Sequence, residues 1–421
     1  MPANESTRSI NASAVTVNGR QYRWPNRPTI VICFDGCDNQ YLAAASEAGV
    51  IPSIETMREN GFATTALAAM PTFTNPNNVS IVCGVPPLVH GVSGNYYIDS
   101  ATGREVMMLD ATPMRAPTIL ASFADAGARV AAITAKDKLR KALSKDLKGI
   151  AFSAEKAASC TEAENGISGV TEMVGRPAPD QYSGDLSLFV LDAGVHLLKA
   201  GRCDLMYLSL SDYIQHRYAP RAPEALEFMA EVDVRIGQLT ASGAVVGMVA
   251  DHGMSDMAND DGKPNVLYVG EALDAAFGAQ AARVICPITD PFVRHHGALG
   301  GFVRVYINQG GPSAGEVAAR LRDVPGVAMA LDREEACRLF EMPADREGDV
   351  AVIAKKGVAL GARSKDHDLS QLAGERLRSH GGLAEQSVPF LLSHPVELPG
   401  RENRSLRNFD IFDFALNRVE A

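Results

Sequence analysis

The sequence has little of what marks nucleic-acid-binding, membrane or secreted proteins. Its formal charge is −10 and no block of like charge stands out, so it offers no basic surface for nucleic acid or anionic membranes. No apolar run approaches the roughly 20 residues of a membrane span. The segment Met1 to Ser6 lacks the charged-then-apolar order of a secretion signal. We therefore expect a cytoplasmic protein with no nucleic-acid or membrane partner.

Aromatic residues and paired cysteines are also scarce. Aromatic side chains make up 6% of the chain, with the single tryptophan Trp24, which does not suggest a rich surface for stacking bases. The seven cysteines form an odd, scattered set, and Cys33, Cys83 and Cys203 lie inside apolar segments, as is typical of reduced core thiols. Cys33 and Cys37 could bind a metal, but no second cysteine pair completes a tetrahedral site, which favours a core role.

What is present suits a globular enzyme with a large core and room for a second module, because 46% of the 421 residues are hydrophobic and 21% are charged. Strand-like runs alternate with helical stretches, which predicts an α/β fold with a mostly parallel sheet flanked by helices. The predicted strands are Thr29–Phe34, Ala63–Ala69, Arg129–Thr134, Leu205–Leu210 and Val245–Ala250. The predicted helices are Tyr41–Asn60, one that begins near Pro76, Pro117–Ala126 and Pro223–Thr240.

A second strand-rich stretch has its own glycine and proline punctuation. It comprises Gly301–Ile307, Val327–Ala330 and Val350–Ile353. We interpret residues 265–374 as an inserted α+β cap domain. Residues 1–264 and 375–421 would then form the metal-binding catalytic core.

Three aspartates follow predicted buried strands, and three histidines lie close to them or late in the chain. These residues are Asp35, Asp212, His216, Asp251, His252 and His380. Open α/β sheets place their sites at the carboxyl ends of parallel strands, so the ligands would gather there. Asp212 and His216 could instead be a surface pair on a helix, Asp251 and His252 a strand-ending turn, and His380 a loop histidine. The metal site would be absent only if all of these alternatives were true at once.

Thr74 lies where the chain passes from strand to helix in Pro71-Thr72-Phe73-Thr74-Asn75-Pro76. Its hydroxyl would sit beside the helix N-terminus, where free N–H groups and the helix dipole favour an alkoxide or a phosphoryl oxygen. A threonine near a helix start is more often only an N-cap. Its position between Asp35 and Gly84-Val85-Pro86-Pro87 favours the catalytic interpretation.

At this point the sequence resembles the alkaline phosphatase superfamily, in its nucleotide pyrophosphatase/phosphodiesterase-like branch, over nearly the whole chain. The motifs are Phe34-Asp35-Gly36, Thr74-Asn75-Pro76-Asn77, Gly84 to Gly91, Asn95-Tyr96-Tyr97, Ser211-Asp212-Tyr213-Ile214-Gln215-His216, Ala250-Asp251-His252-Gly253-Met254 and His380-Gly381-Gly382-Leu383-Ala384-Glu385. Three features favour the carbon–phosphorus hydrolases of that branch. They are Asn75 in place of an aromatic residue, Asn95-Tyr96-Tyr97 and Lys136-Asp137-Lys138.

The resemblance implies an alkaline-phosphatase-like core with two zinc ions. One ion would be bound by Asp35, Thr74, Asp251 and His252, and the other by Asp212, His216 and His380. Carboxylate and imidazole ligands suit Zn²⁺, and Mn²⁺ and Fe²⁺ also fit such donors. The implied activity is hydrolysis of phosphonoacetate to acetate and phosphate through a phosphothreonine at Thr74, with Asn95 holding phosphoryl oxygens. A homodimer is consistent with the same resemblance.

Charge limits how a small anionic phosphonate could be held. Two divalent ions against three carboxylates leave +1, so a phosphonate that also carries a carboxylate needs further cations. Lys136 and Lys138 follow a predicted strand and could converge on one small anion. Arg294 and His296 are second candidates. The alternatives are a solvated helix start for the lysines and an exposed loop for Arg294 and His296.

Two other functions remain open on the sequence. The first is a phosphodiesterase or nucleotide pyrophosphatase that uses the same metals and Thr74. The second is a metal-stabilised protein that captures phosphonates or phosphate without turnover. The presence of Thr74 beside a full ligand set argues against simple capture.

Overall fold

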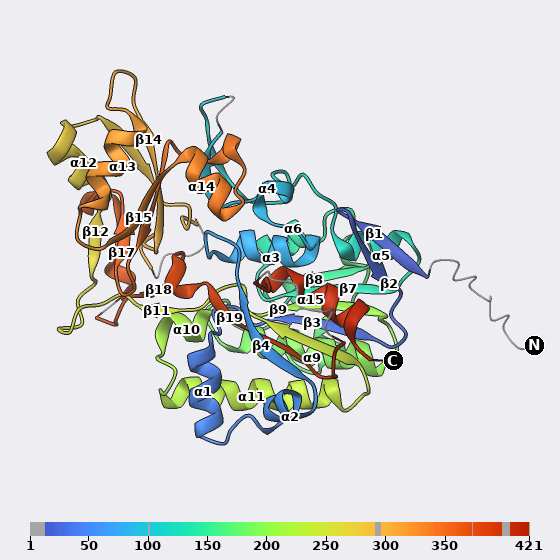
Figure 1. Cartoon of the computed structure of the whole chain (residues 1–421). Coiled ribbons are helices and arrows are strands. Elements are labelled where there is room, and N and C mark those ends of the chain that lie inside the picture. Colours follow the sequence, from blue (N-terminus) through green and yellow to red (C-terminus); the bar gives the residue numbers. More distant parts are fainter. Residues whose placement is uncertain (1–12, 100–101, 291–295, 373, 398–404, 421) are drawn as a thin grey trace, which may run out of the picture.

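A seven-stranded sheet organises the computed structural model, which describes residues 13–99, 102–290, 296–372, 374–397 and 405–420 (Figure 1). The strand order is β4-β19-β10-β3-β9-β7-β8. The strands are β3 (Thr29–Cys33), β4 (Phe62–Leu67), β7 (Val130–Thr134), β8 (Ile150–Ser153), β9 (Leu205–Ser209), β10 (Val245–Val249) and β19 (Ser387–Leu392). Only β19 runs against its neighbours β10 and β4. The predicted mostly parallel sheet is therefore confirmed.

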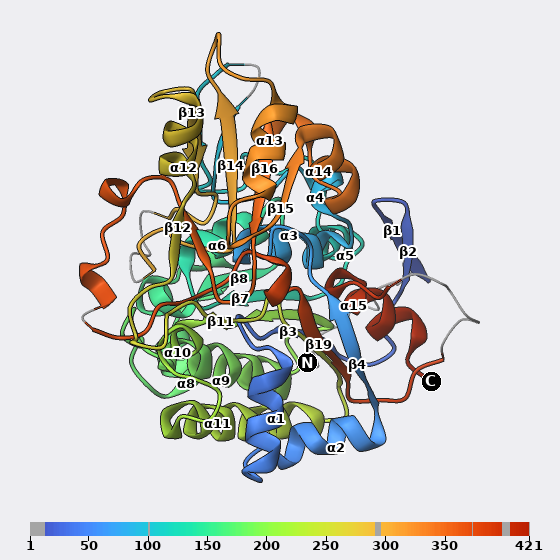
Figure 2. The ribbon, with the colours of Figure 1, turned by 60° about the vertical axis from the view of Figure 1, so that its left-hand side comes forward.

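Helices cover both faces of this sheet (Figure 2). One face carries α1 (Asn39–Glu47), α2 (Pro52–Asn60), α9 (Asp185–Lys199) and α11 (Pro223–Thr240). The other face carries α3 (Thr74–Cys83), α5 (Ile119–Asp125), α6 (Asp137–Leu143) and α15 (Ile411–Asp413). The residues of β3, β9 and β10 are all buried, as expected of parallel strands covered on both sides.

Several short strand pairs and helices lie outside the central sheet and its main helices. The strand pairs are β1 (Ala14–Val17) with β2 (Arg20–Arg23), β5 (Tyr96–Ile98) with β6 (Glu105–Met107), β11 (Ser255–Asp256) with β18 (Arg378–Ser379), and β12 (Val266–Tyr268) with β17 (Ala359–Gly361). The short helices are α4 (Pro87–His90), α7 (Glu162–Asn165), α8 (Val170–Val174) and α10 (Tyr213–Arg217). Among the residues described, no helix combines the length and apolarity needed to cross a membrane.

The region predicted as a cap contains an antiparallel sheet with the order β13-β14-β16-β15. Its elements are α12 (Val269–Phe277), β13 (Ala282–Ile285), β14 (Phe302–Ile307), α13 (Ala314–Arg322), β15 (Val327–Asp332), α14 (Arg333–Phe340) and β16 (Val350–Ala354). They share a second hydrophobic cluster, which also takes in Met70 and Phe73 from the segment before α3. This region thus packs against the start of the Thr74 helix. Its definition as an inserted domain with the bounds 265–374 stays a prediction.

Of two predicted helices near the site, one needs correction and one is confirmed. The single helix predicted over Tyr41–Asn60 is wrong, because Gly49 takes a left-handed conformation with φ +70° and Pro52 opens a new helix, α2. The helix predicted to begin near Pro76 is confirmed, and its first residue is Thr74. Pro76 is tolerated there because the first N–H groups of a helix have no partner within it.

A buried ion pair ties the antiparallel sheet to the loop before β5. Arg304 on β14 contacts Glu347 at 2.7 and 2.9 Å and also donates to the Ser93 carbonyl at 2.9 Å. Both charged side chains are 0% exposed. Removing one partner leaves an uncompensated buried charge, so Arg304→Met should lower the free energy of unfolding by about 3–5 kcal/mol.

Denaturant unfolding measures this loss. Arg58→Met is the control, since Arg58 pairs with Glu55 on the surface of α2 and should change stability by less than about 1 kcal/mol. Equal, small losses in the two variants would show that the buried pair does not hold the sheet to the loop.

Candidate active site

Three adjacent parallel strands bring Asp35, Asp212 and Asp251 to one edge of the sheet. Cys33, the last residue of β3, is in register with Val249 of β10 and with Ser209 of β9. The three carboxylates follow these strand ends within two or three residues. The prediction that they gather at the carboxyl ends of parallel strands is therefore confirmed.

The histidines close around these carboxylates. The Nε2 atom of His216 lies 2.9 Å from Asp212 Oδ2, and that of His380 lies 3.9 Å from the same oxygen. His252 Nε2 lies 3.3 Å from Asp35 Oδ1. The rings of His252 and His380 stack with centroids 3.5 Å apart. Potential ligand atoms thus form two overlapping groups, Asp212 with His216 and His380, and Asp35 with Asp212 and His252.

Backbone carbonyls set the orientation of all three imidazoles. The Nδ1 atoms of His216, His252 and His380 lie 2.7, 2.9 and 2.7 Å from the carbonyl oxygens of Arg378, Gly253 and Thr72. A carbonyl oxygen only accepts, so each Nδ1 carries a proton, and in the neutral ring this leaves Nε2, which lies on the side of the carboxylates, with a lone pair for a metal ion. This is the tautomer that a metal-binding histidine needs.

Electrostatics and hydrogen bonding also fit bound cations. Burial, together with Asp212 and Asp251, holds the pKa of Asp35 well above its usual value, and burial raises that of Asp251. Burial and the neighbouring histidines His252 and His216 hold the pKa of His380 well below its usual value. Asp35 Oδ1 is buried and makes no hydrogen bond within the described part of the chain. Divalent cations would relieve this crowding of carboxylates, so the residues present fit a dinuclear metal centre.

Thr74 is the first residue of α3, and its Oγ1 lies 3.1 Å from His252 Nε2. Its hydroxyl therefore reaches the carboxylate and imidazole cluster from the N-terminus of the helix. The positive end of the helix dipole and the unpaired N–H groups of the first turn favour negative charge at this oxygen.

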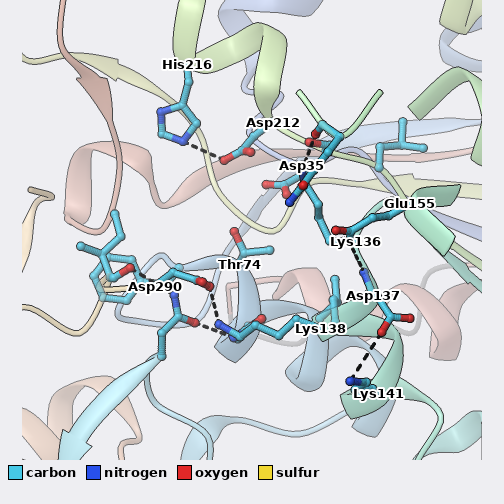
Figure 3. Close-up of a pocket in the computed structure, with 18 of the residues that line it drawn as sticks. Asp35, Thr74, Lys136, Asp137, Lys138, Lys141, Glu155, Asp212, His216 and Asp290 are labelled. Carbon is cyan, nitrogen blue, oxygen red and sulfur yellow. Dashed lines mark hydrogen bonds and ion pairs between the residues drawn. The ribbon is translucent and has the colours of Figure 1, made fainter. Parts of the chain in front are cut away.

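A cavity of about 440 Å³ opens beside these residues. Figure 3 shows Thr74, Asp35, Asp212 and His216 together with Lys136 and Lys138 around it. Asn75 Nδ2 donates to Asn95 Oδ1 at 2.5 Å, and Asn95 Nδ2 donates to the Ile288 carbonyl at 3.2 Å. Asn95 keeps a second amide hydrogen beyond that bond, as a phosphoryl contact requires.

Both predicted lysines line the cavity, and both already have protein partners. Lys138 pairs with Asp290, and the two side chains are only 12% and 11% exposed. Lys136 Nζ donates to the Gln181 carbonyl at 2.6 Å and lies 5.3 Å from the centre of the Tyr182 ring. Burial lowers the pKa of Lys136. These lysines belong to the cavity wall, in contrast to the alternative of a solvated helix start.

His296 also lines the cavity and is buried beside His216, with ring centroids 5.7 Å apart. Burial lowers the pKa of His296 to about 3, so the ring is neutral. Its Nδ1 accepts the Ala298 N–H at 3.1 Å, which places its proton on Nε2. Arg294 lies outside the described residues.

The sequence interpretation did not identify Asp290 or Glu155 as cavity residues. Glu155 follows strand β8 by two residues, so the rule that selected the three aspartates could have found it. Its carboxylate accepts the Asp137 N–H at 2.8 Å and acts electrostatically on Lys136. Asp290 has no such signal, because it follows no strand of the central sheet.

The chain matches the family model for type I phosphodiesterase / nucleotide pyrophosphatase over residues 29–382. Murine ectonucleotide pyrophosphatase / phosphodiesterase 5 shares this fold, with a TM-score of 0.59 and 17% identity over 92% of this chain and 93% of that one. A phosphonoacetate hydrolase of Penicillium oxalicum is 60% identical over 37 residues, which are 8% of this chain. Those residues span 51% of that relative, about half its length.

Phosphonoacetate hydrolase from Sinorhizobium meliloti 1021 matches the whole architecture. Its crystal structure in complex with phosphonoformate has a TM-score of 0.91 and 49% identity, covering 96% of this chain and 98% of that one. The complex with phosphonoacetate gives a TM-score of 0.90 and 48% identity over the same shares. This chain is therefore a hydrolase of the phosphonoacetate hydrolase group within the type I phosphodiesterase / nucleotide pyrophosphatase family.

Proposed function

We propose that this enzyme hydrolyses the carbon–phosphorus bond of phosphonoacetate to acetate and phosphate. The observation that carries the proposal is the position of Thr74 at a helix N-terminus, 3.1 Å from His252 and in the same cavity as Lys136 and Lys138. The cavity thus combines a hydroxyl nucleophile with cations for a second acidic group. The relative from Sinorhizobium meliloti, crystallised with phosphonoacetate and phosphonoformate, supports this substrate class.

Two zinc ions fit the proposed site. One would be held by Asp35, Thr74, Asp251 and His252, and the other by Asp212, His216 and His380. When bound, they would act as Lewis acids on the phosphoryl oxygens and favour ionisation of the Thr74 hydroxyl. Mn²⁺ and Fe²⁺ suit the same donors. A homodimer and a cytoplasmic location stay predictions.

The Thr74 oxygen attacks phosphorus, the carbon–phosphorus bond breaks, and a phosphothreonine forms. The bonding electron pair leaves with the acetate unit and is delocalised into its carboxylate, and a proton from solvent then completes acetate. The ammonium groups of Lys136 and Lys138 stabilise this enolate-like charge. Asn95 and the Nε2–H of His296 donate to anionic oxygens of the substrate. Water then attacks the phosphothreonine, which releases phosphate and restores the hydroxyl.

Thr74→Ala should lower phosphate release from phosphonoacetate by roughly 10³-fold or more, because the attacking oxygen is lost. The control Thr161→Ala removes a threonine that caps the N-terminus of α7 and does not line the cavity, so it should keep full turnover. Mass spectrometry of acid-quenched wild type should find phosphate on Thr74. Full activity of Thr74→Ala would rule out the covalent route.

Substrate choice separates this proposal from a diesterase, which the family match also allows. We expect rapid phosphate release from phosphonoacetate, and little reaction with aminoethylphosphonate or bis-p-nitrophenyl phosphate. The reason is that neither compound has a carboxylate next to its phosphorus group, so neither can bind to Lys136 and Lys138 in the same way. Faster hydrolysis of the diester would reassign the enzyme as a phosphodiesterase.

Lys138→Met should raise the KM for phosphonoacetate roughly 10- to 100-fold, because a charge-assisted contact is lost. The variant also leaves Asp290 without this partner, so the double variant Lys138→Met/Asp290→Asn is needed. A double variant as impaired as the single one would indicate that Lys138 binds the substrate, and recovery would indicate that Lys138 only neutralises Asp290. Lys141→Met, which removes another cavity charge, is the matched control.

Asp212 contributes to both candidate ligand groups, so Asp212→Asn should weaken metal uptake at both. We expect about two zinc ions per wild-type chain and fewer than one in the variant after dialysis against dilute chelator. Metal analysis by mass spectrometry measures this content. Asp192→Asn, which removes a carboxylate paired with Arg235, should retain both ions. Equal contents in Asp212→Asn and wild type would contradict a role for this carboxylate in both sites.

A further inference from the structure

Asn78, in the second turn of α3, makes four hydrogen bonds from a fully buried side chain. Its Nδ2 donates to Asp251 Oδ2 at 3.1 Å and to the Thr74 carbonyl at 3.0 Å. Its Oδ1 accepts from the Tyr207 hydroxyl at 2.7 Å and from the Ser209 hydroxyl at 2.8 Å. An amide side chain has two donor hydrogens and two acceptor lone pairs, so its capacity is fully used.

The chemistry of the partners allows only one orientation of this amide. The Asp251 carboxylate and the Thr74 carbonyl only accept, so the NH₂ group must face them. A half-turn of the amide would place Oδ1 against a carboxylate oxygen. These two acceptors fix which end of Asn78 reaches Asp251, and the two hydroxyls hold the opposite end of the amide in place.

These hydroxyls come from alternate residues of β9, so both point to the same face of the sheet, the face that α3 covers. Tyr207 and Ser209 are fully buried. Buried hydroxyls are costly in an apolar core unless they are hydrogen-bonded, and Asn78 supplies that acceptor. A polar path thus crosses the core from β9 through α3 to Asp251.

Asp251 is itself fully buried and needs donors on both oxygens. Its Oδ1 accepts from the backbone N–H groups of His252 at 3.0 Å and Gly36 at 3.3 Å. Asn78 provides a side-chain donor on Oδ2. Since Asn78 also bonds to the Thr74 carbonyl, one amide joins the candidate nucleophile's turn to a candidate metal ligand.

We propose that Asn78, held by Tyr207 and Ser209, is a positioning residue that sets the orientation of Asp251 as a metal ligand relative to Thr74. The inference rests on the proposed metal centre. Hydrogen-bond partners of metal ligands typically contribute 10- to 100-fold to metal affinity, so removal of this network should weaken metal binding without touching the substrate cavity. Asn78, Tyr207 and Ser209 do not line that cavity.

The sharpest test removes the two hydroxyls and keeps Asn78. Zinc affinity is measured on metal-free protein by competition with a chromogenic chelator. Each of Tyr207→Phe and Ser209→Ala should change the affinity by less than about threefold, since one hydroxyl still orients the amide. The double variant should lose about 10- to 100-fold. Its kcat should fall at low zinc and recover at high zinc, with the KM for phosphonoacetate unchanged.

The matched control is Tyr306→Phe/Ser80→Ala, which removes a tyrosine hydroxyl that accepts the Ile98 N–H at 3.3 Å and a buried serine hydroxyl that lies 2.8 Å from His90 Nε2. It should destabilise the protein to a similar degree and retain wild-type zinc affinity. Asn78→Leu removes every hydrogen bond of the network. The folded variant should bind zinc at least tenfold more weakly than wild type.

The outcomes separate the two proposals. A double variant and Asn78→Leu that bind zinc as tightly as wild type would overturn the positioning role and leave the metal centre standing. A wild-type protein that takes up no divalent ion would overturn the metal centre, and this inference with it. Loss of affinity in the control as large as in the double variant would show a general stability effect and would also overturn the inference.

Discussion

The concentration of buried negative charge at one edge of the sheet is the constraint on which the site depends. The alignment of β10, β3 and β9 places three carboxylates together where burial opposes their ionisation. Around these carboxylates lie imidazoles whose orientation is set by backbone carbonyls, and backbone N–H groups that donate to Asp251. These groups orient the carboxylates without neutralising them. Charge neutralisation is therefore left to cations, which is why a metal centre suits this arrangement.

The start of α3 is unusually polar, and one of its polar side chains, that of Asn78, contacts this cluster of carboxylates. Asparagine is unfavourable inside helices, yet Asn75, Asn77 and Asn78 are all buried there. Asn77 bonds to both backbone groups of Ala69, which fixes the segment that leads into the helix. Asn75 reaches Asn95 in the cavity, and Asn78 reaches Asp251 in the core. These three asparagines thus connect the first turns of α3 to the preceding segment at Ala69, to the cavity wall and to the cluster of carboxylates.

The sequence predicted the parts of the molecule that follow from local pattern. Apolar runs such as Thr29–Phe34 and Leu205–Leu210 identified parallel strands, and the aspartates after them marked the site edge, because strand ends fix where the next residues lie. The antiparallel strand β19 and the break between α1 and α2 were missed. Pairing direction depends on tertiary neighbours, and the break depends on the conformation that Gly49 takes. The amide networks were missed for the same reason, since an asparagine does not encode its partners.

The wall of the cavity was the hardest feature to predict, because it is assembled from segments that lie far apart in the sequence. Lys138 follows a strand of the central sheet, but its partner Asp290 arrives from the segment between β13 and β14. The ammonium of Lys138 already has Asp290 as a counter-ion. The binding free energy that a substrate carboxylate gains at Lys138 is therefore only the difference between the new contact and the existing one. On the proposed roles of Lys136, Lys138 and Thr74, we therefore expect the cavity to distinguish anions by how well they fit between these residues, and a high net charge alone should give an anion little advantage.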